Sequence, residues 1–239
     1  TAATRFQPTP ALLDASPVLD GLVIARPANP TGTMLDRPAL QSIVNWSAAK
    51  NVRLISDEIY HGITFGEPAV TVAALTDDAF IINSFSKYFS MTGWRIGWMV
   101  VPTDLATAVE RLAQNLYISA PALSQYAALA AFDATAELDE KVAGYRRNRD
   151  LLLRELPKAG FDNIAPVDGA FYIFADVSGL TDNAQEFCQK MLAEAGVATT
   201  PGIDFDPARG NRFLRFSIAG DFATMEEAAR RLRLWHKTR

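Results

Sequence analysis

The sequence contains very little cysteine and no long hydrophobic run. A single cysteine, Cys188, among 239 residues excludes a disulfide framework and favours a reducing compartment. No apolar stretch approaches membrane-spanning length, and residues 1–5 (TAATR) lack the layout of a signal peptide. We therefore expect a cytoplasmic protein.

A strong excess of charge of either sign is also missing. The formal net charge is −4, with acidic and basic residues interspersed, which gives no reason to expect a nucleic-acid or membrane partner. We assign no metal-binding residue. Hydrophobic residues make up 49% and charged residues 21% of the chain, a balance typical of a globular protein with a sizeable core.

Short apolar strands alternate with helical segments through the first hundred residues. We expect strands at residues 21–25, 52–56, 79–83 and 96–101, and a helix at residues 38–50. Wholly apolar strands separated by helices or long loops are typical of a parallel sheet that is covered on both faces.

The rest of the chain is first helical and then mixed. Further helices are expected over residues 105–116, 122–133, 137–156, 183–195 and from Thr224, where TMEE resembles a capping box, with strands at residues 170–175 and 212–218. The long, charged helix over residues 137–156 suits a connector between domains. We therefore expect an α/β large domain with a mostly parallel sheet over residues 1–145 and a smaller α+β domain over residues 146–239.

Polar side chains follow three of the predicted strands. Asn29 follows the first strand, Asp57 the second, and residues 84–87 (SFSK) the third. Ligands bind beyond the carboxyl ends of the strands in open parallel sheets. We therefore expect a small, polar, charged ligand at this edge of the sheet.

Each of these residues taken alone has a simpler explanation. An aspartate at a strand end is usually a turn former or a helix N-cap, and a lysine is usually a solvated surface group. For Lys87, the aromatic and methionine side chains between residues 85 and 91 predict burial, and a buried amine needs a partner or a function. His61 is expected to be a packed or surface residue rather than a general base.

Five sequence blocks occur together in the order and at the spacing of one enzyme family. The blocks are residues 28–32 (ANPTG), 56–60 (SDEIY), 84–87 (SFSK), 93–97 (GWRIG) and 212–217 (RFLRFS). With residues 166–172 (PVDGAFY), they resemble the class I and II aminotransferases, which are pyridoxal-phosphate enzymes of fold type I. The resemblance extends over essentially the whole chain.

The resemblance implies roles for the residues that would hold pyridoxal phosphate. Lys87 would carry the cofactor as a Schiff base and shuttle a proton between substrate and cofactor. Asp57 would pair with the ring nitrogen and keep it protonated, so that the ring can accept electrons. Asn29 and Tyr60 would hydrogen-bond the phenolic oxygen of the ring.

The same resemblance also indicates which residues would bind the charged groups of the cofactor and the substrate. Ser84, Ser86 and Arg95 would bind the phosphate, since a guanidinium offers two parallel donors to a dianion. Arg215 would clamp the α-carboxylate of the substrate, with Asn29 also binding substrate. The residues alone leave two alternatives open, an ion pair within the sheet for Arg95 and a surface-exposed strand arginine for Arg215.

The implied activity is transfer of an amino group between an α-amino acid and a 2-oxo acid, in a homodimer. The part of the family that precedes Thr1 has no counterpart here, so we expect a C-terminal portion of a longer protein that is inactive by itself. A pyridoxal-phosphate-dependent lyase of the same fold and an inactive or regulatory aminotransferase-like domain are the alternatives. The sequence does not indicate which amino-acid side chain is accepted.

Overall fold

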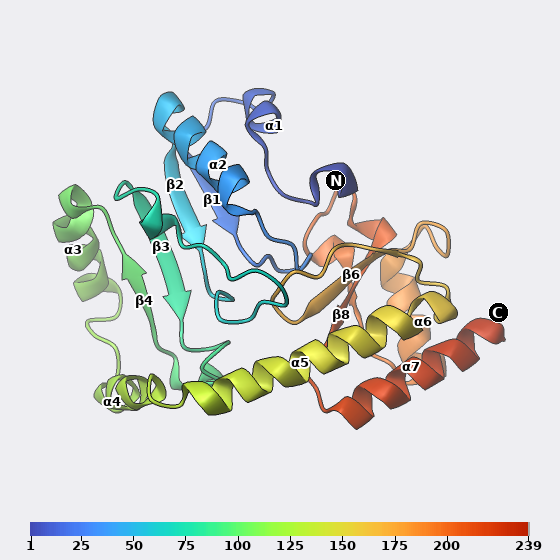
Figure 1. The fold of residues 1–239 in the computed structure, drawn as a ribbon. Coiled ribbons are helices and arrows are strands. Elements are labelled where there is room, and N and C mark those ends of the chain that lie inside the picture. The colour runs from blue at the N-terminus through green and yellow to red at the C-terminus, as the bar shows by residue number, and fades with distance from the viewer. Residues whose placement is uncertain (239) are drawn as a thin grey trace. The chain divides into compact units, whose positions relative to one another are not determined.

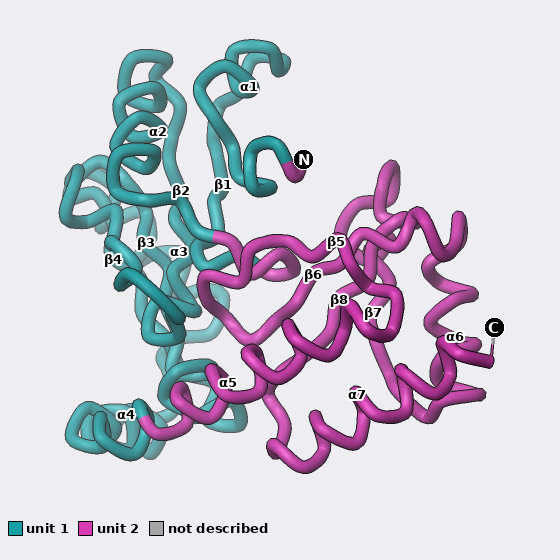
Figure 2. Tube along the Cα trace, turned by 45° about the vertical axis from the view of Figure 1, so that its right-hand side comes forward, with its two compact units in different colours: residues 1, 3–28, 34–139 teal, residues 2, 29–33, 140–239 magenta. Residues whose placement is uncertain are grey.

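Two compact units make up residues 1–238, which the computed structural model describes. Unit 1 comprises residues 1, 3–28 and 34–139, and unit 2 comprises residues 2, 29–33 and 140–239 (Figure 2). The short segment 29–33 thus belongs with the C-terminal half of the chain. Helix α5 (Thr135–Glu155) contains the boundary between residues 139 and 140.

A four-stranded sheet is the centre of unit 1 (Figure 1). Its strands lie in the order β1 (Gly21–Ala25), β2 (Arg53–Asp57), β3 (Ala79–Ser84) and β4 (Gly97–Val100). Strands β1, β2 and β3 are parallel, and β4 runs antiparallel to β3. The predicted α/β class with a mostly parallel sheet is confirmed.

The direction of β4 differs from the parallel arrangement that its apolar sequence suggested. Parallel neighbours need a crossover connection, usually a helix. Between β3 and β4 the chain forms a loop with the short 3-10 turn η3 (Thr92–Trp94), and Phe85 N donates to Ile96 O at 3.1 Å. The chain therefore returns along the same edge as an antiparallel neighbour.

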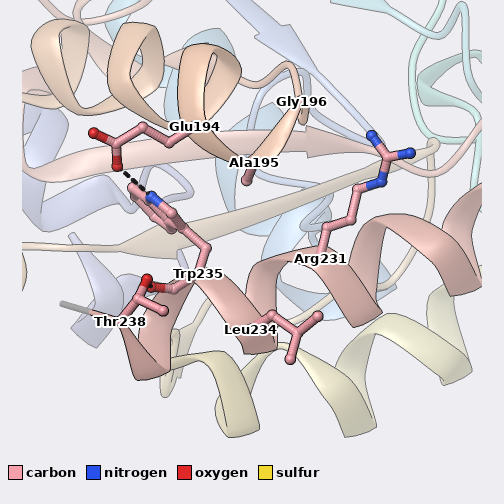
Figure 3. A pocket seen from close by; sticks show the side chains of 7 residues that line it. All are labelled: Glu194, Ala195, Gly196, Arg231, Leu234, Trp235 and Thr238. Atoms are coloured by element: carbon pink, nitrogen blue, oxygen red, sulfur yellow. Dashed lines mark hydrogen bonds between the residues drawn. The ribbon is translucent and has the colours of Figure 1, made fainter.

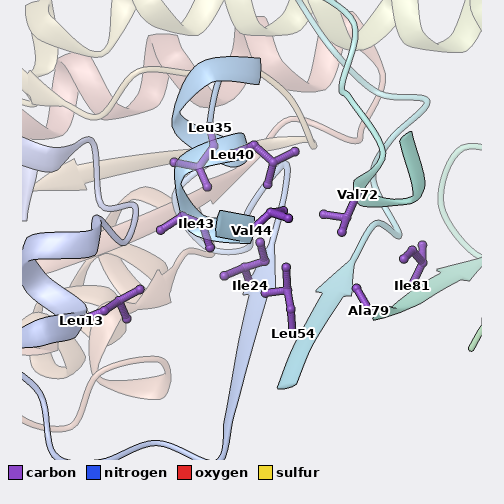
Figure 4. Close-up of a cluster of buried hydrophobic side chains, with 10 residues drawn as sticks. All are labelled: Leu13, Ile24, Leu35, Leu40, Ile43, Val44, Leu54, Val72, Ala79 and Ile81. Carbon is purple, nitrogen blue, oxygen red and sulfur yellow. The ribbon is translucent and has the colours of Figure 1, made fainter. Parts of the chain in front are cut away.

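Four helices accompany the sheet of unit 1, namely α1 (Pro10–Asp14), α2 (Arg37–Lys50), α3 (Ala106–Leu116) and α4 (Ala122–Ala131). Helix α2 begins after Asp36, whose Oδ1 accepts a hydrogen bond from Ala39 N at 2.8 Å, and ends at Asn51 with a left-handed φ of 55°. Its apolar side packs on the sheet in a cluster of Leu13, Ile24, Leu35, Leu40, Ile43, Val44, Leu54, Val72, Ala79 and Ile81 (Figure 4). Full burial of one such leucine contributes about 2 kcal/mol.

Several large apolar side chains of unit 1 lie outside this core. Val23 of β1 is 66% exposed, and Leu116 of α3 and Tyr126 of α4 are 77% and 76% exposed. The predicted cover on both faces of the sheet is therefore incomplete within residues 1–238. No helix among these residues is both long and apolar enough to cross a bilayer.

Unit 2 contains an antiparallel sheet, residues 140–155 of the long helix α5, and two further helices. The strands lie in the order β5 (Asn163–Ile164), β6 (Tyr172–Asp176), β8 (Phe213–Ser217) and β7 (Thr200–Pro201), and the helices are α6 (Ala184–Ala195) and α7 (Phe222–Lys237). Aromatic rings build its core, with centroids 5.2 Å apart for Phe161 and Phe216 and 5.3 Å apart for Phe187 and Trp235. The predicted α+β character of the C-terminal part is confirmed.

The start of α7 differs from the sequence prediction. The helix begins at Phe222 with Asp221 as its N-cap residue, and Met225 N donates to Asp221 O at 3.1 Å. Thr224 therefore lies inside the first turn, where its side chain cannot act as an N-cap. The predicted capping box at Thr224 is wrong, because the backbone hydrogen bonds of the helix start three residues earlier, at Asp221.

Candidate active site

The carboxyl ends of β2 and β3 bring predicted site residues together in unit 1. Asp57 is the last residue of β2, Ser84 is the last residue of β3, and Asp57 lies opposite Ile82 in the parallel register. Both strands therefore end at the same edge of the sheet. The segments that follow them carry Tyr60 and Lys87.

Lys87 and Tyr60 lie close together on these two segments. Lys87 Nζ is 5.8 Å from the centroid of the Tyr60 ring, within cation–π range. Tyr60 is 5% exposed, but Lys87 is only half-buried, so the predicted burial of this amine is partial. The neighbouring aromatic rings instead pack against each other, with the centroids of Phe85 and Phe89 4.7 Å apart. The Lys87 amine therefore remains accessible to a ligand.

Asp57 also forms the turn that its position suggested. Asp57 Oδ1 accepts a hydrogen bond from Ile59 N at 3.1 Å, and Asp57 O accepts one from Arg26 N at 3.1 Å. Within residues 1–238, Asp57 Oδ2 accepts no hydrogen bond. The turn thus orients the carboxylate and leaves Oδ2 able to accept a hydrogen bond from a ligand.

Ser84 ends β3, and Ser86 and Arg95 lie in the connection between β3 and β4. Ser84 Oγ lies 2.9 Å from Ser86 Oγ, and Ser86 N donates to Ser84 Oγ at 3.0 Å. Ser84 Oγ is also 3.2 Å from the carbonyl of Ile96, the residue after Arg95. Two hydroxyls and a guanidinium at the end of β3 and in the segment that follows it are suitable donors for a phosphate.

The backbone of Arg95 adopts an unusual conformation for a side chain of its size. Its φ is 51°, in the left-handed region that glycine occupies more easily, and Nη1 donates to Thr92 O at 2.9 Å. This conformation costs about 1 kcal/mol or more, and such strain gathers at functional sites. Arg95 is exposed and forms no ion pair with residues 1–238, so the structure does not support the ion-pair alternative.

Arg215 of β8 is held by four side chains of unit 2. Nη1 donates to Asn29 Oδ1 at 2.7 Å, and Nη2 donates to Thr200 Oγ1 at 3.1 Å. The guanidinium carbon lies 4.3 Å from the centroid of the Tyr172 ring and 4.9 Å from that of Phe205. Arg215 is half-buried, so the alternative of a freely exposed strand arginine is wrong.

The hydrogen bond from Arg215 fixes the amide of Asn29. Because Oδ1 accepts a hydrogen bond from the guanidinium, Nδ2 points away from Arg215 and can donate a hydrogen bond to another group. Gly32 holds this segment in place, since Gly32 O accepts a hydrogen bond from Gly169 N at 3.0 Å. Gly32 has a φ of 71°, and a Cβ there would lie 2.9 Å from Tyr172 O, so the turn requires glycine.

Two residues that hold Arg215 carry no signal that singles them out in the sequence. Thr200 lies in the two-residue strand β7, and Phe205 follows the 3-10 turn η6 (Gly202–Asp204). A threonine and a phenylalanine in a loop have many structural uses. Only the fold reveals that both contact the guanidinium.

The two segments that carry Tyr60 and Lys87 touch through Gly62 and Tyr88. A Cβ on Gly62 would lie 2.3 Å from ring carbons of Tyr88, a distance that atoms in proteins do not adopt. Replacing Gly62 with alanine is therefore expected to displace the Tyr88 ring and to cost about 1–3 kcal/mol in the free energy of unfolding. Denaturant unfolding measures this loss. Gly66→Ala is the matched control, because a Cβ at Gly66 meets nothing within 4 Å, and equal losses in both variants would contradict the close packing.

His61 has a charged partner, Glu58, which was not evident in the sequence. His61 Nδ1 lies 3.2 Å from Glu58 Oε2. Burial lowers the pKa of His61 to about 4, although Glu58 opposes this shift and Arg26 adds to it. His61 is therefore neutral at pH 7 and is a packed residue, as expected.

The low pKa of His61 predicts how stability depends on pH. The unfolded chain takes up the proton near pH 6.5 and the folded chain near pH 4, so the contribution of His61 is complete above pH 6.5. As the pH falls from 6.5 to 4 this contribution is lost, and the free energy of unfolding decreases by about 3 kcal/mol once both states are protonated. Denaturant unfolding of His61→Gln should show a flatter pH profile over this range. His236→Gln, at the other histidine, should keep the steep profile; a steep profile in both variants would contradict the assignment.

A separate cavity of about 660 Å³ lies at the ends of α6 and α7 in unit 2 (Figure 3). Its lining residues are Glu194, Ala195, Gly196, Arg231, Leu234, Trp235 and Thr238. Within it, Trp235 Nε1 donates to Glu194 Oε2 at 2.7 Å. No predicted site residue lines this cavity, and among residues 1–238 no cluster of metal ligands is present.

The chain matches proteins of known family along nearly its whole length. The family model "Aminotransferase class I and II" matches residues 9–232. The valine–pyruvate aminotransferase of Mycobacterium tuberculosis is 52% identical over 237 residues, which cover 97% of this chain and 61% of that protein. The (5-formylfuran-3-yl)methyl phosphate transaminase of Methanocaldococcus jannaschii is 34% identical over 89% of this chain and 56% of its own length.

A solved structure agrees with the fold of the chain. The crystal structure of an aminotransferase from Mycobacterium tuberculosis superposes with a TM-score of 0.96 at 50% identity, covering 99% of this chain and 62% of that one. This chain thus spans about three fifths of the length of these relatives. It belongs to the class I and II aminotransferases.

Proposed function

We propose that this chain is part of a pyridoxal-phosphate-dependent aminotransferase, which moves an amino group between an α-amino acid and a 2-oxo acid. The single observation that carries the proposal is the grouping of a half-buried lysine, Lys87, with Tyr60, Asp57 and two serine hydroxyls at the ends of two parallel strands. Lysine, carboxylate, phenol and phosphate-binding donors are the groups that pyridoxal phosphate requires, so the residues present fit this cofactor. When bound, the cofactor supplies a ring that accepts electrons from the substrate carbon.

Lys87 is the covalent anchor and the proton carrier in this proposal. Its Nζ would hold the cofactor through a covalent bond that the amine of the substrate displaces, which leaves the lysine as a free amine. The freed Nζ would then accept the proton of the substrate α-carbon and donate it to the cofactor. Its half-buried position supports this role, because the same amine must be held near Tyr60 and yet reach the substrate.

Asp57, Tyr60 and Asn29 bind the polar atoms of the ring in this proposal. Asp57 Oδ2, which accepts no hydrogen bond within residues 1–238, would accept one from the protonated ring nitrogen while Ile59 N holds Oδ1. The phenol of Tyr60 donates to the phenolic oxygen of the ring. Asn29 presents Nδ2 to the same oxygen, because Arg215 occupies its Oδ1.

Ser84, Ser86 and Arg95 bind the phosphate in this proposal. The paired hydroxyls lie at the end of β3 and the guanidinium in the segment that follows, and the strained backbone at Arg95 supports a functional reason for an arginine at that position. A phosphate bound there gains charge-assisted hydrogen bonds.

Arg215 binds the α-carboxylate of the substrate. Thr200 and Asn29 hold its two terminal nitrogens, and two aromatic rings limit its rotation, so the guanidinium is oriented before the substrate arrives. A preorganised planar fork binds a carboxylate more strongly than a mobile one.

The relatives support an aminotransferase over the two alternatives. Proteins that match this chain are named as aminotransferases or transaminases, which does not favour a lyase or an inactive regulatory domain. The relative at 52% identity is named for valine and pyruvate, so this pair is our first choice of substrates. We also propose a homodimer, as the family resemblance suggests, and a cytoplasmic location, as the single cysteine suggests; light scattering after size-exclusion chromatography tests the dimer.

Half-reactions test this function directly. The full-length protein is loaded with pyridoxal phosphate, and its visible absorption is followed as single amino acids are added. We expect valine or a similar α-amino acid to shift the band, and pyruvate or another 2-oxo acid to restore it. Release of ammonia and pyruvate without an added oxo acid would instead indicate a lyase, and an unchanged band with every amino acid would contradict the proposal.

A further inference from the structure

A buried polar cluster in unit 1 takes no part in the proposed function. It consists of Arg26, Ser56, Glu58 and His61, of which Arg26 and Ser56 are 0% exposed and Glu58 is 2% exposed. Successive strand residues point to opposite faces. Ser56 therefore points to the side opposite to Asp57, and Glu58 shares the side of Ser56 because its Oε1 accepts a hydrogen bond from Ser56 Oγ.

Glu58 is the centre of this cluster. Its Oε1 accepts hydrogen bonds from Ser56 Oγ at 3.0 Å and from Val72 N at 2.8 Å. Its Oε2 lies 3.2 Å from His61 Nδ1, and Arg26 Nη2 is 3.8 Å from Oε1. The carboxylate thus connects the ends of β1 and β2 with the backbone at Val72.

The fold alone does not account for this cluster. Arg26 Nη2 donates to Val70 O at 2.5 Å, but within residues 1–238 Arg26 Nε, Arg26 Nη1 and His61 Nε2 have no hydrogen-bond partner. Buried charges that are incompletely paired are a poor source of stability, and apolar residues of similar size often serve a fold as well or better. A different role for the cluster is therefore indicated.

The cluster holds the turn that carries two of the cofactor-binding residues. Glu58 directly follows Asp57, and His61 directly follows Tyr60, so the turn is held at two points. The backbone is fixed as well, because Glu58 N donates to Ile82 O at 2.8 Å. A shift of Glu58 would therefore move the Asp57 carboxylate.

We propose that Glu58, held by Arg26, Ser56 and His61, is a positioning residue that fixes the turn of Asp57 and Tyr60 for cofactor binding. The inference rests on the proposed function. Glu58 itself does not touch the cofactor; it acts through its two neighbours. It determines how tightly pyridoxal phosphate binds and at which pH the visible band changes.

A charge-neutral double variant tests this role. Glu58→Gln alone leaves the buried charge of Arg26 unpaired and can unfold the protein, whereas Arg26→Met with Glu58→Gln removes both charges. In the full-length protein the double variant should keep the unfolding midpoint of the parent. Its dissociation constant for pyridoxal phosphate should rise about tenfold or more, the scale of loss seen when supporting residues of metal sites are replaced.

Two further measurements separate positioning from general stability. In the cofactor-free protein, amide hydrogen exchange of residues 57–63 should be about tenfold faster in the double variant. Glu155→Gln is the matched control, because Glu155 is a partly buried carboxylate of unit 2 that binds Lys158 and Arg233. It should leave the dissociation constant, the pH midpoint of the band and this exchange unchanged.

The outcomes distinguish the inference from the proposed function. A double variant with the dissociation constant, pH midpoint and exchange of the parent overturns the inference alone. If the double variant does not fold, Ser56→Ala replaces it. The loss of one hydrogen bond to Glu58 should then weaken pyridoxal-phosphate binding about threefold. Binding as tight as in the parent would overturn the inference. A parent that binds no pyridoxal phosphate overturns the proposed function, and the inference with it.

Discussion

Lys87→Ala should abolish turnover by the full-length protein, with a loss of about 10⁴-fold or more. This residue is assigned both the covalent anchoring of the cofactor and the proton transfer, and proton transfer alone contributes about 10²- to 10⁴-fold. The variant should also lack the lysine-dependent visible band. Activity with the preferred amino acid and absorption with added pyridoxal phosphate measure the two effects.

Two other lysine variants serve as controls for Lys87→Ala. Lys141 is exposed on α5, so Lys141→Ala should keep both the band and the activity of the parent. Lys87→Arg keeps a positive charge but offers no amine that can bond the cofactor, and it should fail like the alanine variant. Substantial activity in Lys87→Ala would contradict the assignment.

Arg215→Lys should lower kcat/KM for the amino acid about 100-fold, which corresponds to about 3 kcal/mol. A lysine keeps the charge but loses the planar fork that Asn29 and Thr200 orient, and it cannot bind a carboxylate through two parallel hydrogen bonds. The dissociation constant of pyridoxal phosphate should change little, because the assigned partner of Arg215 is the substrate.

The matched control for Arg215 lies just before the same strand. Arg212 is exposed and pairs with Asp176, with 2.6 Å between Nη2 and Oδ2. Arg212→Lys should leave kcat/KM near that of the parent, since exposed ion pairs contribute little. A similar decrease in both variants would show that the effect is one of general charge or folding, and would remove the reason for assigning the carboxylate to Arg215.

The sequence predicted most elements of the fold because their apolar patterns are local. Strand β1 at residues 21–25 agrees with the prediction, and α2 differs from it by one residue. Burial was harder to predict. The apolar positions of α3 have helical spacing, yet Leu112 and Leu116 are exposed, because spacing defines a face and not what covers it.

Features that depend on distant contacts were missed for a physical reason. The antiparallel direction of β4 depends on a loop whose hydrogen bonds the sequence does not display. The first turn of α7 starts at Phe222, although Thr224 has the better N-cap side chain, because the backbone ladder begins at Asp221.

The candidate site was predictable where the chemistry is carried by local motifs. Asp57, Lys87 and Arg95 stand in short motifs, and the structure brings Asp57 and Lys87 to neighbouring segments of unit 1. Phe205 could not be predicted, since its contact with Arg215 joins two loops that the sequence does not relate. The same is true of Glu58, whose partners come from three separate segments.

The identity of the lysine that bonds the cofactor is the central claim, and one measurement tests it most directly. The full-length protein is incubated with pyridoxal phosphate, reduced with borohydride, digested, and mapped by mass spectrometry. We predict one stable pyridoxyl adduct on Lys87, absent when an excess of amino-acid substrate is added before reduction. An adduct on another lysine, or none on Lys87 under conditions in which the cofactor is bound, would contradict the account.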